Sequence, residues 1–350
     1  MPFRHLSQAF ERVAIVVVLA GMVACGDSSG PGAAPGDEAD YDEALRNRIS
    51  ISGVSSGAYL AIQTHIAFAD RVGSVAAIAG GPYHCAEGDV QTALARCMTG
   101  DGLDIEPLIE YTTDFASAGT IASLDKIAAS RVWIFHSPVD TVVSPSAGVA
   151  LRDFYTDFVD ESAVVFVDDV EAAHGWVTVD AGLACNELGG DFINACDYDA
   201  AGALLHHAYG ELKPRGKSIE QNLVLLDVSG YFESDSDVAD QAFAYIPSSC
   251  ENSDSGCRLH VALHGCVQGS EFIEDRFVTQ AGLNEWAETN DIVVVYPQLE
   301  KSMFNPKGCW DWWGYTGDDY DQRSGSQVAG IGALIEAFAS GTLPVNHADP

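Results

Sequence analysis

The chain has 350 residues, of which 51 are acidic and 17 are basic, and its formal net charge at pH 7 is −34. This excess of negative charge excludes an electrostatic grip on nucleic acids or anionic membrane surfaces, and it suits a neutral substrate. Hydrophobic residues make up 47% of the sequence, enough to bury the core of one large globular domain. An acidic surface of this kind is expected to repel itself unless salt screens it.

The N-terminal segment 1–24 has the pattern of a signal peptide. Two arginines precede an apolar run at 13–24 that is too short to span a bilayer. The four residues that end at Cys25 resemble a bacterial lipobox, in which the cysteine is lipidated; ordinary secretion is the alternative. Residues 25–44 are rich in Gly, Ser, Pro and Asp and are typical of a flexible tether. We expect an exported protein whose only contact with a membrane is a lipid anchor on Cys25, followed by a catalytic domain at 45–350.

A strand-like stretch beginning at Ile49 runs into Gly-Val-Ser-Ser-Gly at 53–57 and then into small and apolar residues with helical spacing. Strand, sharp turn and helix form the context that a nucleophile elbow requires, with Ser55 at its tip. The glycines have a steric reason, because the tight turn brings the strand and helix too close for side chains. Ser52 and Ser56 lack this flanking pattern. A Gly/Ser-rich turn without a catalytic role is the alternative interpretation.

Candidate partners for Ser55 follow two later strands. Asp140 lies in the loop after the strand predicted at 131–136, where an open α/β sheet presents site residues. His174 follows the next predicted strand, which completes the chain order Ser, Asp, His. His174 would act as the general base, and Asp140 would orient it. A turn-forming aspartate after proline is the alternative for Asp140, and the rival acids are Asp168 and Asp169.

Nine cysteines are present, and setting Cys25 aside leaves eight. An even number in an exported chain predicts disulfides, although the sequence leaves their connectivity open. No cysteine and histidine cluster has the spacing of a zinc site, so we expect neither a metal nor a cofactor. Proximity along the chain favours Cys85 with Cys97, Cys185 with Cys196 and Cys250 with Cys257, which leaves Cys266 and Cys309.

The oxyanion donors of a serine hydrolase usually come from the residue after the nucleophile and from an earlier loop that follows a strand ending in His-Gly. Here the only such strand, at 258–263 with His-Gly at 264–265, lies late in the chain. The final helix at 327–338 would lead into the elbow strand. This order predicts a circularly permuted α/β-hydrolase, a single domain with a mostly parallel sheet flanked by helices. The segment 221–246 predicts an extra hairpin at the sheet edge.

Three tryptophans, Trp310, Trp312 and Trp313, stand within four residues of a predicted loop. They cannot all point inward, so they predict an exposed apolar patch that binds substrate. If Cys309 pairs with Cys266, this patch would lie beside the oxyanion loop. The alternative places Trp310 in the core, with the other two covering loops.

Four motifs carry a resemblance: Gly-x-Ser-x-Gly at 53–57, Ala-His at 173–174, Cys-Asp-Tyr-Asp-Ala-Ala-Gly at 196–202 and Leu-His-Gly-Cys-x-Gln at 263–268. Together they resemble the extracellular poly(3-hydroxybutyrate) depolymerases in their permuted single-domain form. The similarity covers about residues 45–340. It implies Ser55 as nucleophile with Asp140 and His174 as partners, and the backbone N–H groups of Ser56 and Cys266 as the oxyanion hole. Nothing after the final helix resembles the polymer-adsorbing domain of many relatives.

We therefore expect a secreted or lipid-anchored serine esterase. It would act as a monomer, without a cofactor, on polyhydroxyalkanoate polymer or oligomers through an acyl-enzyme. A carboxylesterase for acylated plant polysaccharides or feruloyl-type phenolic esters is the alternative among enzymes, because related hydrolases share the triad. A non-catalytic surface-binding lipoprotein is the alternative outside them, and the presence of all three triad residues argues against it.

Overall fold

The computed structural model describes residues 43–251 and 256–343, which belong to one compact unit. The predicted signal peptide, Cys25 and nearly all of the predicted tether lie outside the described residues, so those predictions and the domain boundaries remain predictions. Within the described ranges, no helix combines the length and apolar character needed to cross a membrane.

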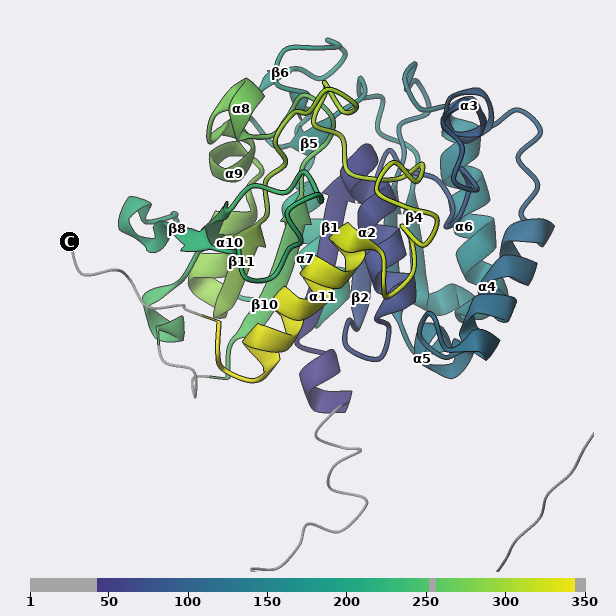
Figure 1. The fold of residues 1–350 in the computed structure, drawn as a ribbon. Coiled ribbons are helices and arrows are strands. Elements are labelled where there is room, and N and C mark those ends of the chain that lie inside the picture. Colours follow the sequence, from purple (N-terminus) through teal and green to yellow (C-terminus); the bar gives the residue numbers. More distant parts are fainter. Residues whose placement is uncertain (1–42, 252–255, 344–350) are drawn as a thin grey trace, which may run out of the picture. The chain divides into compact units, whose positions relative to one another are not determined.

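Among the described residues, eight strands form the central sheet (Figure 1). Six of them form a parallel array, and two more at one edge are added through antiparallel pairings, so that β9 alone among the eight runs against the others. The parallel strands are rich in Val, Ile and Ala, as expected for strands covered on both faces. In order across the sheet the strands are β4 (Val164–Val167), β3 (Arg131–Phe135), β2 (Ser74–Ile78), β1 (Ile49–Val54), β10 (Arg258–Leu263), β11 (Ile292–Tyr296), β9 (Gln241–Tyr245) and β8 (Leu223–Asp227).

The first strand, β1, lies in the middle of the sheet and pairs with the late strand β10, with Gly53 opposite Leu263. If the chain is followed from β8 around to β4, neighbours along the chain are neighbours in the sheet, except that β10 and β11 are exchanged. The circular permutation predicted from the order of the motifs is therefore confirmed. The predicted edge hairpin is also confirmed, as β8 and β9.

Helices cover both faces of the sheet, and each face has its own apolar core. On one face α2 (Ser56–Ala67) packs on β1 and against α11 (Ser326–Ala339), the yellow helix in front of the strands in Figure 1. α6 (Pro145–Phe158) packs on β3 and β4 nearby. On the other face α7 (Ala200–Tyr209) packs on β3 and against α10 (Leu283–Asn290).

Shorter elements surround this framework. The stretch 105–127 forms two helices, because Gly119 at φ 75° ends the first of them. A three-stranded sheet follows His174. The remaining elements are α3 (Val90–Thr92), η1 (Ala93–Cys97), α4 (Glu106–Ala118), α5 (Leu124–Ala128), η2 (Glu161–Ala163), β5 (Trp176–Thr178), β6 (Leu183–Ala184), β7 (Ile193–Ala195), η3 (Glu220–Asn222), η4 (Ser248–Cys250), α8 (Ser270–Ile273) and α9 (Arg276–Gln280).

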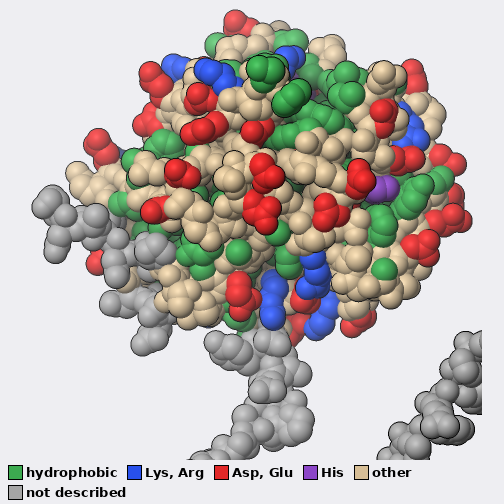
Figure 2. All heavy atoms as spheres, in the orientation of Figure 1, with side chains coloured by type: hydrophobic (Ala, Val, Ile, Leu, Met, Phe, Trp, Pro, Cys, Tyr) green, Lys and Arg blue, Asp and Glu red, His purple; other side chains and the backbone are tan. Residues whose placement is uncertain are grey.

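Four disulfides connect loops of the described residues; three join the pairs that proximity along the chain favours, and the fourth joins the two cysteines that remain. Three close short loops, and the fourth bridges two distant segments. Figure 2 shows acidic side chains spread over one face, whereas hydrophobic side chains gather toward its upper end. The pairs are Cys85–Cys97, Cys185–Cys196, Cys250–Cys257 and Cys266–Cys309.

Candidate active site

Ser55 stands at the sharp turn between β1 and α2, with φ 56° and ψ −121°. This left-handed backbone is costly for a residue with a side chain. A Cβ added to Gly53 would lie 2.1 Å from the Gly57 carbonyl oxygen, and one added to Gly57 would lie 2.4 Å from the carbonyl oxygens of Leu263 and His264. Only glycine fits at either position, which is the steric requirement that the sequence predicts for the elbow.

The structure brings His174 and Asp140 into contact. Nδ1 of His174 donates to Oδ2 of Asp140 at 2.7 Å, and the two residues are only 5% and 6% exposed. The other carboxylate oxygen accepts from the N–H groups of Val142 and Val143 at 2.8 and 3.0 Å. Burial alone would raise the pKa of Asp140, but these hydrogen bonds hold it below its ordinary value. Asp140 therefore stays ionised and fixes the ring of His174, with Nε2 on the opposite side of the ring.

His136, assigned from the sequence only to a strand, lies behind this pair. Its Nε2 donates to the Val143 carbonyl oxygen at 3.0 Å and stands 4.0 Å from Oδ2 of Asp140. Burial lowers the pKa of His136, so the ring is neutral. The neutral ring of His136 therefore lies beside the Asp140 carboxylate and adds no charge there. The four-residue spacing from His136 to Asp140 is the sequence signal that could have indicated that His136 lies beside the carboxylate.

Two buried side chains orient the peptide units of the 264–268 loop. Nε2 of His264 accepts from the Leu299 N–H at 3.2 Å, so Nδ1 carries the proton and donates to the Gly265 carbonyl oxygen at 2.7 Å. In a trans peptide the N–H points opposite to the C=O, so the Cys266 N–H is turned away from His264. Neither this N–H nor that of Ser56 has an acceptor among the described residues. Two unengaged donors are what an oxyanion hole needs.

Gln268 closes the same loop, and it is 1% exposed. Its Oε1 accepts from the Gly265 N–H at 2.7 Å, and its Nε2 donates to the carbonyl oxygens of Asp191 and Phe192 at 3.0 Å each. The ring of Phe192 packs edge-on against that of His174, with centroids 6.4 Å apart. Gln268 thus connects the 264–268 loop, called the oxyanion loop below, to the segment 191–192 beside His174.

A cleft of about 630 Å³ collects these groups at the carboxyl ends of the strands. Ser55, Ser56, His174 and Cys266 all line it. No hydrogen bond joins Ser55 to His174 within the described part of the chain, and such bonds are often long before substrate binds. The rest of the lining is mainly apolar: Val54, Tyr59, Val90, Leu94, Met98, Val142, Val143, Leu188, Phe192, Val267, Trp312 and Trp313.

Two curated proteins are similar to this chain over most of its length. The poly(3-hydroxybutyrate) depolymerase of Delftia acidovorans is 37% identical over 315 residues, which is 87% of this chain and 62% of that protein. The polyhydroxybutyrate depolymerase of Talaromyces funiculosus is 32% identical over 311 residues, which is 84% of this chain and 90% of that protein. The chain belongs to the poly(3-hydroxybutyrate) depolymerase family.

Solved structures of poly(3-hydroxybutyrate) (PHB) depolymerases share the fold. One is the enzyme of Penicillium funiculosum, with a TM-score of 0.77, and another is a serine-to-alanine variant complexed with an R3HB trimer, with a TM-score of 0.79. Both are 31% identical to this chain and cover 85% of it and 96% of their own length. No protein-family model matches the chain.

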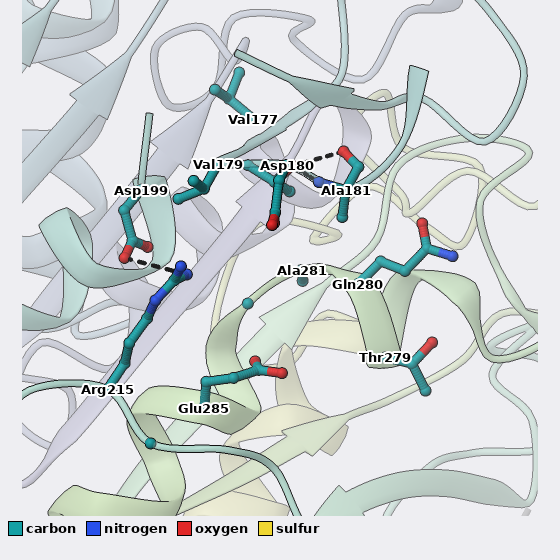
Figure 3. A pocket seen from close by; sticks show the side chains of 13 residues that line it. Val177, Val179, Asp180, Ala181, Asp199, Arg215, Thr279, Gln280, Ala281 and Glu285 are labelled. Atoms are coloured by element: carbon teal, nitrogen blue, oxygen red, sulfur yellow. Dashed lines mark hydrogen bonds and ion pairs between the residues drawn. The ribbon is translucent and has the colours of Figure 1, made fainter. Parts of the chain in front are cut away.

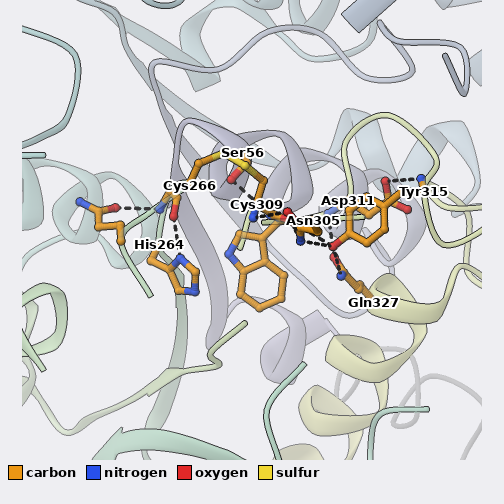
Figure 4. The surroundings of a disulfide bond; sticks show 11 residues. Ser56, His264, Cys266, Asn305, Cys309, Asp311, Tyr315 and Gln327 are labelled. Atoms are coloured by element: carbon orange, nitrogen blue, oxygen red, sulfur yellow. Dashed lines mark hydrogen bonds between the residues drawn. A yellow bond between two sulfur atoms is a disulfide. The ribbon is translucent and has the colours of Figure 1, made fainter. Parts of the chain in front are cut away.

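In this PHB depolymerase-family chain the Cys266–Cys309 disulfide joins the oxyanion loop to the tryptophan loop (Figure 4). Asn305 donates to and accepts from the backbone of Cys309, at 2.8 and 2.9 Å. The Trp310 N–H donates to the side-chain oxygen of Ser56 at 3.3 Å. The disulfide segment is therefore held directly against the elbow.

The prediction that Trp310 contacts substrate is wrong. Its side chain is 0% exposed and does not line the cleft; its ring lies 5.4 Å from that of His264, where it backs the oxyanion loop. Trp312 and Trp313 do line the cleft, and Trp312 stacks on Tyr59 with ring centroids 4.6 Å apart. The apolar patch thus consists of two tryptophans supported by a tyrosine.

A second pocket, of about 260 Å³, lies near the N-terminal end of α10 (Figure 3). Its labelled side chains include Asp199, Arg215 and Glu285, and the first two form an ion pair at 3.7 Å. It has neither a histidine nor a serine in its lining. In the described ranges, no group of three or more His, Cys, Asp or Glu side chains is arranged to hold a metal ion.

Proposed function

We propose that this protein is a serine-dependent hydrolase that cleaves poly(3-hydroxybutyrate)-type polyesters or their oligomers. The observation that carries the proposal is one apolar cleft lined by the elbow serine, by a histidine bonded to a buried carboxylate, and by two unengaged N–H donors. Similarity to the structure that holds an R3HB trimer supports the substrate class.

In the proposed reaction the Ser55 hydroxyl attacks the ester carbonyl while Nε2 of His174 takes its proton. The N–H groups of Ser56 and Cys266 stabilise the oxyanion that forms. His174 then returns the proton to the leaving alkoxide, and the carbonyl to alkoxide bond breaks to leave an acyl-enzyme. A water molecule, activated by His174, then attacks the acyl-enzyme in the same way and releases the acid together with free Ser55. Asp140 stabilises the imidazolium in both halves.

The cleft also suits the substrate chemically. A 3-hydroxybutyrate ester is uncharged and carries a methyl branch on each unit, and apolar side chains make up most of the lining. Trp312 and Trp313 supply flat surfaces for such a chain. The net charge of −34 does not penalise a neutral polymer.

Four disulfides support residence in an oxidising compartment, in agreement with the predicted export. We further propose that Cys25 is lipidated after cleavage of the signal peptide and that the enzyme acts as a monomer. Mass spectrometry of the mature N-terminus tests the first proposal: a diacylglyceryl cysteine supports it, and an unmodified N-terminus at any position contradicts it. Light scattering tests the second.

The deciding experiment is the clearing of an amorphous poly(3-hydroxybutyrate) suspension by the mature protein, by Ser55→Ala, and by Ser229→Ala as an exposed-serine control. Clearing that is lost only in Ser55→Ala supports both substrate and nucleophile. Hydrolysis of a short nitrophenyl ester that depends on Ser55, without clearing, would move the substrate to the sugar or phenolic esters. Absence of both activities, and of labelling by a fluorophosphonate, would overturn an enzymatic function.

A further inference from the structure

The charges around the cleft are distributed unlike those of the whole chain. Acidic residues outnumber basic ones 51 to 17 in the sequence. Yet among the described residues that line the cleft there is no aspartate or glutamate, and there is one lysine, Lys307. Among the described residues of the lining, Lys307 is the only lysine or arginine.

The backbone of Lys307 is fixed beside the oxyanion loop. Its carbonyl oxygen accepts from the Val267 N–H at 2.7 Å, and two residues later Cys309 is bonded to Cys266. The ammonium group lies at the end of a four-carbon stem, so its reach is about 6 Å from this anchored point. It can therefore meet a group of the substrate that lies past the oxyanion donors.

Lys307 also lacks a carboxylate partner in the described part of the chain. Within the described ranges no Asp or Glu oxygen lies within 4.0 Å of its ammonium group. Lys301, on the same loop, differs: it pairs with Glu271 at 3.6 Å and does not line the cleft. Lys301 is thus engaged in an ion pair within the protein, whereas Lys307 is available to a ligand.

We propose that Lys307 binds the free carboxylate end of hydroxyalkanoate oligomers. This inference rests on the proposed esterase function and adds a subsite to it. A polyester chain has a hydroxyl end and a carboxyl end, and every hydrolysis creates a new carboxylate. When Ser55 attacks an ester carbonyl, the hydroxyl-end fragment becomes the acyl group and the carboxyl-end fragment leaves as the alcohol. Lys307 therefore holds the leaving fragment, and it orients short chains in one direction.

The negative charge of the protein is the reason that a contact with Lys307 matters for an anionic oligomer. A net charge of −34 repels an anionic oligomer, whereas it is indifferent to the uncharged interior of a long polymer. One cation at the rim of the cleft offsets that repulsion locally; because Lys307 is exposed, its attraction is short-ranged and is screened by salt. Soluble oligomers released from the polymer would then remain substrates.

The test compares two substrates that differ only at this end, the (R)-3-hydroxybutyrate trimer as free acid and as methyl ester. The proteins are the wild type, Lys307→Gln, Lys307→Glu and the matched control Lys301→Gln. The ratio of KM for the acid to KM for the ester is expected to rise about threefold in Lys307→Gln and about tenfold in Lys307→Glu. It should stay unchanged in Lys301→Gln. In 1 M NaCl, which screens both the lysine contact and the net repulsion, the ratios of the wild type and Lys307→Gln should converge.

Hydrolysis of the methyl ester by every variant serves as the internal control for folding and chemistry. A KM ratio that is the same in the wild type, Lys307→Gln and Lys307→Glu would overturn the proposal and leave the esterase function standing. An equal change in Lys301→Gln would also overturn it, because any lysine of the loop would then act through the general field. Failure of the wild type to hydrolyse either trimer would instead refute the proposed function.

Discussion

The amide group of Gln268 and the backbone of Phe192, 76 residues apart in the sequence, are joined by a hydrogen bond of 3.0 Å. The other end of the same amide accepts from the Gly265 N–H. One side chain therefore spans the gap between the loop that presents the Cys266 N–H and the segment that packs against His174. The relative placement of the proposed oxyanion donor and general base depends on it.

Replacing Gln268 by Met keeps the length and removes all three hydrogen bonds. We expect kcat to fall about tenfold with KM changed less than twofold, because the donors misalign for the transition state more than for the ground state. Gln268→Glu keeps the acceptor for Gly265 but places a buried carboxylate oxygen against two carbonyl oxygens, so its kcat should fall at least as far as that of the Met variant. Steady-state kinetics of folded variants check this. Equal kcat in all three proteins would show that the bridge has no effect on positioning.

Loss of the Cys266–Cys309 disulfide should affect activity as well as stability. Its 43-residue separation predicts a stability loss of about 4 kcal/mol for the double alanine variant, and the freed loop should lower kcat about tenfold. The control is the double alanine variant of Cys250 and Cys257, which should lose about 2 kcal/mol and keep its kcat. Urea unfolding and initial rates measure the two effects. A disulfide that acts only on stability would leave both kcat values intact.

The tryptophans should separate into two classes. Trp313→Ala removes a partly exposed ring from the cleft and should raise KM for oligomers about three- to tenfold with little change in stability. Trp310→Ala removes a fully buried ring and should cost about 3–5 kcal/mol of stability. Thermal melts and oligomer kinetics distinguish them. The assignment is refuted if Trp310→Ala is as stable as the wild type.

Three buried histidines should make the fold sensitive to acid. Burial lowers the pKa of His65 and His260 to about 3 and that of His264 to about 4, whereas an unfolded histidine has a pKa of about 6.5. The unfolded state therefore binds more protons below pH 6.5. The stabilisation is full above about pH 6.5 and falls by about 1.4 kcal/mol per pH unit for each histidine as the pH drops toward 4.

Urea unfolding at pH 7, 6 and 5 measures this loss. The series is run in 1 M NaCl, because protonation of surface carboxylates relieves repulsion and acts in the opposite direction. An unfolding free energy that does not change between pH 7 and pH 5 would contradict the uptake of protons by the buried histidines on unfolding.

Salt itself should stabilise the protein. The net charge of −34 repels itself at low ionic strength, and the screening length falls from about 30 Å at 0.01 M to about 3 Å at 1 M salt. We expect Tm to rise steadily over that range. Sodium chloride and potassium chloride should act alike if screening is the cause, and a flat or falling Tm would refute it.

The sequence predicts the features that depend on neighbours along the chain. The five-residue motif at 53–57 predicts the close contacts that require glycine at Gly53 and Gly57, and the late position of the His-Gly loop is enough to predict the permutation. The fate of Trp310 and the bridge by Gln268 could not be predicted in this way. Each depends on a partner far away in the sequence, His264 in one case and Phe192 in the other, and on which face of a loop a side chain occupies.

The left-handed backbone of Ser55 has an evolutionary consequence. A side chain at φ 56° costs about 1–3 kcal/mol that glycine would not, so Ser55→Gly should be more stable than the wild type and inactive. Selection for heat resistance alone would therefore favour glycine at position 55 and yield an inactive protein. A library screened for thermostable descendants would therefore need to be tested for activity at every round, because a substitution that relieves this backbone strain also removes the proposed nucleophile.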